Sequence, residues 1–208
     1  ELSSFLTVQE GCDKFCTFCV VPYTRGSEYS RPVEEIITEA KLLVSGGAKE
    51  IVLLGQNVNA YHGLTHNGHE VGLDYVINSI ADIEFLDRIR FTTSHPRDMS
   101  KNLVKLFGSQ KKLMPLMHLP VQSGSDKVLK QMNRGHTIKD YKEIIYSLKS
   151  VRPEISFSSD FIVGYPGETD LDFYDTINLI QEVKFSQAFS FMYSHRPGTP
   201  ASMINDQV

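Results

Sequence analysis

The sequence feature that constrains this chain most is a short loop that carries all of its cysteines. Cys12, Cys16 and Cys19 are separated by three and then two residues, and the 208-residue sequence contains no other cysteine. Cysteine thiolates are the usual ligands of 4Fe-4S clusters, and three of them leave one iron without a protein ligand. Catalytic metal centres keep such an open position and structural ones avoid it. We therefore expect a 4Fe-4S cluster with one open iron at this loop.

Other interpretations of the cysteines fit less well. A structural zinc needs four ligands at short spacing, but the nearest histidine along the chain is His62. An odd number of cysteines without an apolar targeting segment indicates a reducing compartment, so we expect no disulfide and a cytoplasmic location. His62, His66 and His69 lie in a glycine-rich stretch, and their spacing fits no helix face, so we assign them no metal.

Composition limits the possible partners. The chain has 21 basic and 25 acidic residues, a net charge of −4 and a pI near 6.0. It therefore lacks the overall basic field that drives binding to nucleic-acid phosphates, and any RNA affinity must be local or supplied from elsewhere. No run of 18 apolar residues occurs, which predicts no membrane span.

The hydrophobic pattern predicts one α/β domain over residues 1–208. Apolar runs of strand length alternate with amphipathic stretches of helical length, without a low-complexity linker. We expect strands at residues 5–8, 51–54, 89–92, 117–121, 155–163 and 188–193. We expect helices at about residues 32–46, 73–83, 102–107, 125–132, 137–150 and 169–182. A closed eight-unit barrel needs about 250 residues, so six units predict a partial (β/α)6 barrel, with a doubly wound sheet as the alternative.

In either fold, ligands bind at the carboxyl ends of the strands. Polar or glycine-rich segments follow each predicted strand, and the first of them is the cysteine loop. The others are Gly55 to Asn59, Ser94 to Arg97, Gln122 to Ser125, Gly164 to Glu168, and Ser194 to Arg196. We therefore expect one site at this end of the barrel.

The cysteine loop after a first barrel strand resembles the radical S-adenosylmethionine (SAM) enzymes. Segments along nearly the whole chain are similar to the methylthiotransferase branch of that family. These segments are residues 11–26, 53–61, 91–96, 118–125 and 160–169. The resemblance implies that SAM binds the open iron, that reductive cleavage gives a 5′-deoxyadenosyl radical, and that the radical leads to methylthiolation of C2 of an isopentenyladenosine next to the anticodon of tRNA.

The resemblance also suggests which residues contact SAM. Gly55-Gln56-Asn57 stands where family members often have Gly-Gly-Glu for the amino group, so an amide replaces the carboxylate here. Gln122 and Ser123 are candidates for the ribose or carboxylate, or are ordinary loop-capping residues. Arg134 either pairs with the SAM carboxylate or is a solvated surface arginine. Gly164 either allows close approach of the adenine or serves a tight turn.

Further partners are implied by the resemblance alone. They are an electron donor such as flavodoxin or ferredoxin, a sulfur donor, and a second 4Fe-4S cluster in a flanking N-terminal methylthiotransferase domain. A C-terminal RNA-binding domain is also implied, and the start at Glu1 without Met agrees with a piece of a longer protein.

Two questions stay open at this point. His95, Asp160 and His195 are expected near the site, but the sequence assigns them no catalytic role. The alternatives for function are a sister branch acting on threonylcarbamoyl-adenosine or a ribosomal protein, or an iron-sulfur electron-transfer module.

Overall fold

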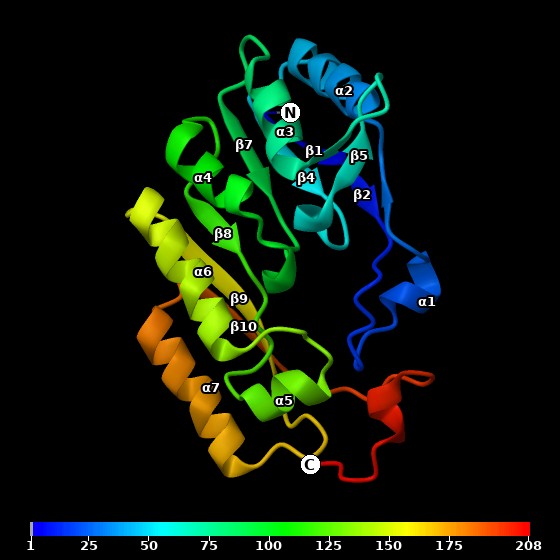
Figure 1. The fold of residues 1–208 in the computed structure, drawn as a ribbon, viewed down its shortest axis with the longest axis vertical. Helices are drawn as coiled ribbons and strands as arrows, with labels where there is room; N and C mark the ends of the chain where they lie inside the picture. The colour runs from blue at the N-terminus through cyan, green and yellow to red at the C-terminus, as the bar shows by residue number, and fades with distance from the viewer. Residues whose placement is uncertain (1) are drawn as a thin grey trace.

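The computed structural model describes residues 2–208 as an open arc of parallel strands covered by helices (Figure 1). The strands of the arc are β1 (Ser3–Thr7), β4 (Glu50–Leu54), β7 (Arg88–Phe91), β8 (Leu116–His118), β9 (Ser156–Val163) and β10 (Gln187–Met192). The helices between them are α2 (Val33–Ser45), α3 (Leu73–Ala81), α4 (Lys101–Ser109), α5 (Asp126–Gln131), α6 (Ile138–Val151) and α7 (Asp170–Val183).

The strand order distinguishes a partial barrel from a doubly wound sheet. Three strands pair in the order β1-β4-β7 and three in the order β10-β9-β8, all in parallel. A parallel bridge between Ile89 and Leu113 links the two groups. Each strand therefore lies beside its predecessor in the arc, whereas a doubly wound sheet reverses direction at a switch point. The predicted partial barrel is confirmed, and the barrel is not closed.

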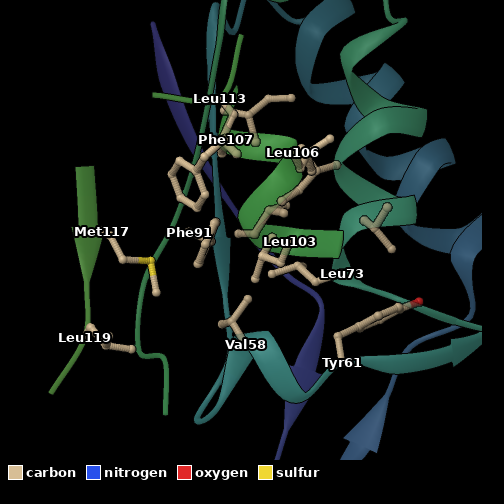
Figure 2. Close-up of a cluster of buried hydrophobic side chains, with 14 of the residues drawn as sticks. Val58, Tyr61, Leu73, Phe91, Leu103, Leu106, Phe107, Leu113, Met117 and Leu119 are labelled. Atoms are coloured by element: carbon tan, nitrogen blue, oxygen red, sulfur yellow. The ribbon is translucent and has the colours of Figure 1, made fainter. Parts of the chain in front are cut away.

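Apolar side chains from both groups of strands fill the space between the arc and its helices (Figure 2). Phe91 of β7 packs against Phe107 of α4, with ring centroids 5.9 Å apart. Helix α3 buries Leu73, Val76 and Ile80 along one face, as the spacing of a core-facing helix requires. The core thus lies at the middle of the strands and leaves their carboxyl ends free for polar residues.

Helix boundaries follow the expected signals. Thr137 and Asp140 form a capping box at the start of α6, as predicted, and Thr169 and Asp172 form another at the start of α7. Helix α2 follows Pro32 and ends before a glycine pair whose second member, Gly47, has a φ of +100°. These signals were local, which is why the sequence revealed them.

Several short elements were not predicted. They are β2 (Gln9–Glu10), α1 (Val21–Arg25), β3 (Tyr29–Ser30), β5 (His62–Leu64) and β6 (Glu70–Gly72), with 3-10 turns η1 (Val58–Ala60), η2 (Pro96–Asp98) and η3 (Pro200–Met203). The predicted strand at residues 117–121 was too long. β8 ends at His118 because Pro120 has no N–H for the ladder, and pairing with β9 resumes only at a bridge from Gln122 to Phe161.

The β10 end of the arc is more exposed than the strands inside it. All six residues of β10 are exposed, whereas the central residues of β4 are buried. Helix α5 and the turn η3 lie near the carboxyl ends of the strands (Figure 1).

In the part of the chain that is described, no helix is long and apolar enough to cross a membrane.

Candidate active site

The three cysteines line one cavity at the carboxyl ends of the strands. This cavity has a volume of about 340 Å³ and is also lined by Gly55, Gln56, Asn57, Gln122 and Arg134 among others. Cys16 is buried, and Cys12 and Cys19 are half-buried. Within residues 2–208, no three His, Cys, Asp or Glu side chains converge closely enough to hold a single metal ion. Three thiolates around one cavity suit a cluster, in which each thiolate binds a different iron.

Burial disfavours ionisation of two of the three thiols. Burial raises the pKa of Cys12 to about 11, although the Lys14 backbone N–H opposes this shift. Burial also raises the pKa of Cys19. A coordinating metal deprotonates such thiols outright. Bound iron would therefore offset the cost of burying the Cys12 and Cys19 thiolates.

The cysteine loop is held in place by residues from distant parts of the chain. The Thr17 carbonyl accepts the Ala201 N–H at 2.9 Å, and the Thr17 N–H donates to the Met132 carbonyl at 3.1 Å. The side chain of Asn133 donates to the carbonyls of Lys14 and Phe15. Gly11, at the start of the loop, has a φ of +71°, and a Cβ there would lie 2.0 Å from a backbone carbonyl oxygen. Only glycine fits at this position.

Gln9, which the sequence did not single out, joins the cysteine loop to the segment after β4. Its buried side chain donates to the Gly11 carbonyl at 2.7 Å and accepts the Asn57 N–H at 3.0 Å. A Cβ on Gly55 would lie 2.6 Å from Gln9 Oε1, so this glycine is needed for close approach. Gln56 in turn accepts the Gly11 N–H at 2.7 Å. The side-chain oxygen of Gln56 is therefore already engaged in fixing the loop.

A small charged network lies beside these residues and was also missed. Lys14 Nζ lies 2.9 Å from Asp98 Oδ1, and the Asn57 side chain donates to Asp98 Oδ2 at 2.7 Å. Glu28 lies within 4.0 Å of Lys14. The partners are up to 84 positions apart, so no local pattern could have revealed them. Asn57 Oδ1 stays buried without a partner among the described residues.

Arg134 is not a surface residue. It is 5% exposed, its Nη2 donates to the Pro120 carbonyl at 2.6 Å, and its Nη1 lies 3.4 Å from Cys16 Sγ. The alternative of a solvated arginine is therefore wrong. Its Nε is buried without a partner in residues 2–208, and the residue lines the cavity, so pairing with the SAM carboxylate remains a prediction.

The other three candidates for SAM contact differ in whether they line the cavity. Gln122 has a φ of +80° and lines the cavity. Ser123 is fully buried, accepts the Ser125 N–H at 3.1 Å and lies 3.4 Å from Thr176 Oγ1, so its position corresponds to the loop-capping alternative and does not support a SAM contact. Gly164 is not among the lining residues; its φ of +69° and its N–H bond to Glu168 correspond to the tight-turn alternative.

The three polar residues without an assigned role also differ in their position relative to the cavity. Asp160 lines the cavity, and His118 Nε2 lies 3.6 Å from its carboxylate. His95 is 6% exposed, and burial followed by the nearby Arg134 charge lowers its pKa to about 2, so it is neutral. His195 is exposed, and its ring lies 3.1 Å from the Ser202 carbonyl. His195 therefore belongs to a surface turn.

A second cavity adjoins the first. It has a volume of about 290 Å³ and shares Phe18, Gln122 and Asp160 with it. Its other wall includes Phe191 of β10 and Arg196. The two cavities are therefore neighbours, and the second one reaches the open edge of the barrel at β10.

The cavity wall fits a polar ligand. Asn57 Oδ1, Ser94 Oγ, His95 Nε2 and Arg134 Nε belong to residues that line the first cavity. Each of these atoms is buried and has no hydrogen-bond partner among the described residues. Buried polar atoms are nearly always paired, so a concentration of unpaired ones indicates a missing ligand. The donor set of three thiols and several polar groups suits a cluster with SAM bound to it.

Comparison with known proteins identifies the class. Residues 6–180 match the Radical SAM superfamily, so this chain belongs to that superfamily, as its cysteine loop predicted. Solved radical SAM enzymes share its fold. The methyltransferase TsrM of Kitasatospora setae, with cobalamin and a 4Fe-4S cluster bound, has a TM-score of 0.76 at 15% identity, over 96% of this chain and 38% of that one. SuiB of Streptococcus suis, bound to SAM, has a TM-score of 0.67 at 14% identity, over 100% of this chain and 44% of that one.

Closer relatives share one description. The chain is 61% identical to the tRNA-2-methylthio-N(6)-dimethylallyladenosine synthase of Ehrlichia canis, over 100% of its own length and 47% of the relative. It is 62% identical to the synthase of the same name from Wolbachia pipientis of Culex pipiens, over 99% of its own length and 47% of the relative. The chain thus spans about half the length of these relatives.

Proposed function

We propose that this chain is the radical-generating core of a tRNA methylthiotransferase that acts at C2 of isopentenyladenosine. The observation that carries the proposal is the cavity in which Cys12, Cys16 and Cys19 face unpaired polar atoms of Asn57 and Arg134. The similarity to synthases that act on dimethylallyladenosine in tRNA supports the substrate. When bound, a reduced cluster and SAM supply a 5′-deoxyadenosyl radical, which is able to remove hydrogen from an unactivated carbon.

The chain's own residues hold and shield this chemistry. The cysteines bind the cluster, while Arg134 lies against Cys16 Sγ and places its positive charge in the cavity wall. Gln9 fixes the loop after β4 relative to the cysteine loop. Phe18 packs between α5 and η3 and lines both cavities, which limits access of water. Exclusion of water protects reactive species from side reactions.

Sulfur attachment requires further components. All three cysteines of this chain are committed to the one cluster, so a sulfur-bearing centre must lie outside these 208 residues. We propose that a second 4Fe-4S cluster in a flanking N-terminal domain is that centre, and that a C-terminal domain supplies most of the RNA affinity. A sulfur donor and an electron donor such as flavodoxin or ferredoxin complete the system, in the cytoplasm.

A labelling experiment tests the proposal. The chain is reconstituted without oxygen, reduced with dithionite, and incubated with SAM and an anticodon stem-loop RNA that carries isopentenyladenosine deuterated at C2. We expect methionine and 5′-deoxyadenosine to form, deuterium to appear in the 5′-deoxyadenosine, and no methylthio product to accumulate. The matched control is Cys16→Ala, which lacks a cluster ligand.

The same experiment separates the alternatives. Deuterium transfer from an RNA with threonylcarbamoyl-adenosine, or hydrogen transfer from a ribosomal protein, in preference to isopentenyladenosine would favour a sister branch. A reduced cluster whose EPR signal ignores SAM, with no 5′-deoxyadenosine formed, would favour an electron-transfer module and overturn the proposal.

A further inference from the structure

A third cavity, here called the hollow, lies at the same end of the barrel and has no role in the chemistry above. It lies between α4 and α6, has a volume of about 610 Å³, and is lined in part by Arg97, Lys101 and Lys105. Figure 1 shows α4 and α6 side by side on the outside of the arc. Both helices begin at the carboxyl ends of the strands, so this hollow opens near the rim of the cysteine cavity.

The hollow and the cavity share a wall. His95 lines the cavity, and Arg97, two residues further, lines the hollow. Arg134 lines the cavity, and Gly135 and His136 line the hollow. The rings of His95 and His136 meet edge to face across this wall, with centroids 5.9 Å apart. A ligand in the hollow is therefore only one layer of side chains away from the cavity.

The uncommitted charge of the hollow is positive. Within residues 2–208, Arg97, Lys101 and Lys105 have no acidic partner within 4.0 Å. The opposite wall carries two carboxylates, so the lining has three cations against two anions. Asp140 accepts hydrogen bonds from Thr137, and Glu143 lies 4.0 Å from Lys139. The lining therefore keeps a net positive charge in a chain of net charge −4, and this charge is concentrated on the η2 and α4 side, where it favours an anion.

The remaining lining favours a nucleic-acid backbone over other anionic partners. Apart from His136, no aromatic side chain of the described residues lines the hollow, and Met99, Val104 and Ile144 are aliphatic. Base recognition uses aromatic stacking, and protein interfaces are enriched in aromatic residues. Free cations at spacing i, i+4 without aromatics correspond instead to phosphate contacts, which position RNA without reading its sequence.

We propose that this hollow between α4 and α6 binds backbone phosphates of the RNA substrate next to the adenosine that enters the cysteine cavity. The inference rests on the proposed function for the identity of the RNA. It adds a site for the strand that leaves the cavity rim, and it gives this chain a small RNA affinity of its own in spite of its net negative charge.

Charge reversal tests the site. The double variant K101E/K105E is compared with K41E/K111E, which changes the net charge equally through two lysines that lie outside the hollow and are exposed. Binding of an isopentenylated anticodon stem-loop RNA to the reconstituted protein is measured by fluorescence anisotropy over a series of KCl concentrations. For K101E/K105E we expect a roughly tenfold higher Kd at low salt and a salt slope smaller by about 0.7 for each phosphate that is no longer neutralised. K101R/K105R should restore both.

Each other outcome overturns the proposal. Equal effects of K101E/K105E and K41E/K111E would show only a general dependence on charge. A weakening that depends on RNA sequence would indicate base reading, and slower SAM cleavage with flavodoxin but not dithionite, at unchanged RNA affinity, would indicate docking of an acidic electron carrier. Failure of the proposed function is a separate result, because it would appear as absent deuterium transfer while K101E/K105E still weakened RNA binding.

Discussion

The apolar core and the cysteine cavity are built on the same strands, but buried polar groups are hydrogen-bonded in the core and partly unpaired in the cavity wall. In the core, the Tyr141 hydroxyl donates to the Leu119 carbonyl at 2.9 Å, and the Tyr61 hydroxyl donates to the Arg31 carbonyl at 2.6 Å. In the cavity wall, Asn57, Ser94 and Arg134 each keep a buried atom unpaired within residues 2–208. An unpaired buried group costs free energy. We infer that the core satisfies its polar groups within the chain, whereas the cavity wall satisfies its polar groups only when ligands are bound.

The largest expected effect is removal of the cluster with the fold retained. Cys16→Ala should reduce bound iron from about four per chain to background, because the cluster needs all three thiolates. Iron and sulfide analysis after anaerobic reconstitution measures this. Since the core does not depend on the cluster, the apo forms of the variant and the parent protein should unfold within a few degrees of each other. A variant without cooperative unfolding would contradict the separation of the two regions.

The converse change should damage the core alone. Phe107 is fully buried and contacts Phe91 (Figure 2), so Phe107→Ala should lower the free energy of unfolding by about 3–5 kcal/mol. Urea denaturation of the apo protein measures the cost. The iron content per folded molecule should stay the same. A variant that folds but fails to take up iron would show that the two regions are coupled more tightly than their contacts suggest.

Removing one hydroxyl from the core and one from the cavity wall should affect the unfolding free energy differently. Tyr141→Phe removes a paired core hydroxyl and should cost about 1 kcal/mol of unfolding free energy. Ser94→Ala removes an unpaired cavity hydroxyl, so the apo protein should be unchanged or more stable by up to about 1 kcal/mol. Thermal unfolding with and without SAM measures both, and SAM should stabilise Ser94→Ala less than the parent protein. Destabilisation of apo Ser94→Ala would show that this hydroxyl has a partner.

The smallest effect is expected at the open edge of the barrel. Phe189 of β10 is 48% exposed, and replacement by Ala should change the unfolding free energy by no more than about 0.5 kcal/mol. Urea denaturation beside Phe107→Ala makes the contrast between covered and uncovered strands quantitative. A cost near that of Phe107→Ala would mean that β10 is buried in solution.

The sequence predicted the framework better than the details of the site. Strand and helix positions follow from apolar periodicity and from caps such as Thr137 with Asp140, which are local signals. The cysteine spacing likewise revealed the cluster loop. The roles of Gln9 and Asp98 could not be predicted, because each depends on which loops meet at the barrel rim. The burial of Arg134 depends on the strand interruption at Pro120, whose carbonyl it binds, and composition does not reveal such a pairing.

The anchoring of the cysteine loop has a consequence for the order of events during synthesis. The cysteines leave the ribosome before two of the residues that anchor their loop, because Thr17 between them bonds to Met132 and to Ala201, far along the chain. At typical elongation rates of about 5–20 residues per second, the last of these partners follows about 10–40 s later. During that interval the cysteine loop lacks one or both of these backbone hydrogen bonds, which fix it. Iron is therefore best delivered after Ala201 has left the ribosome, and cells that synthesise the protein must keep its nascent thiols reduced until then.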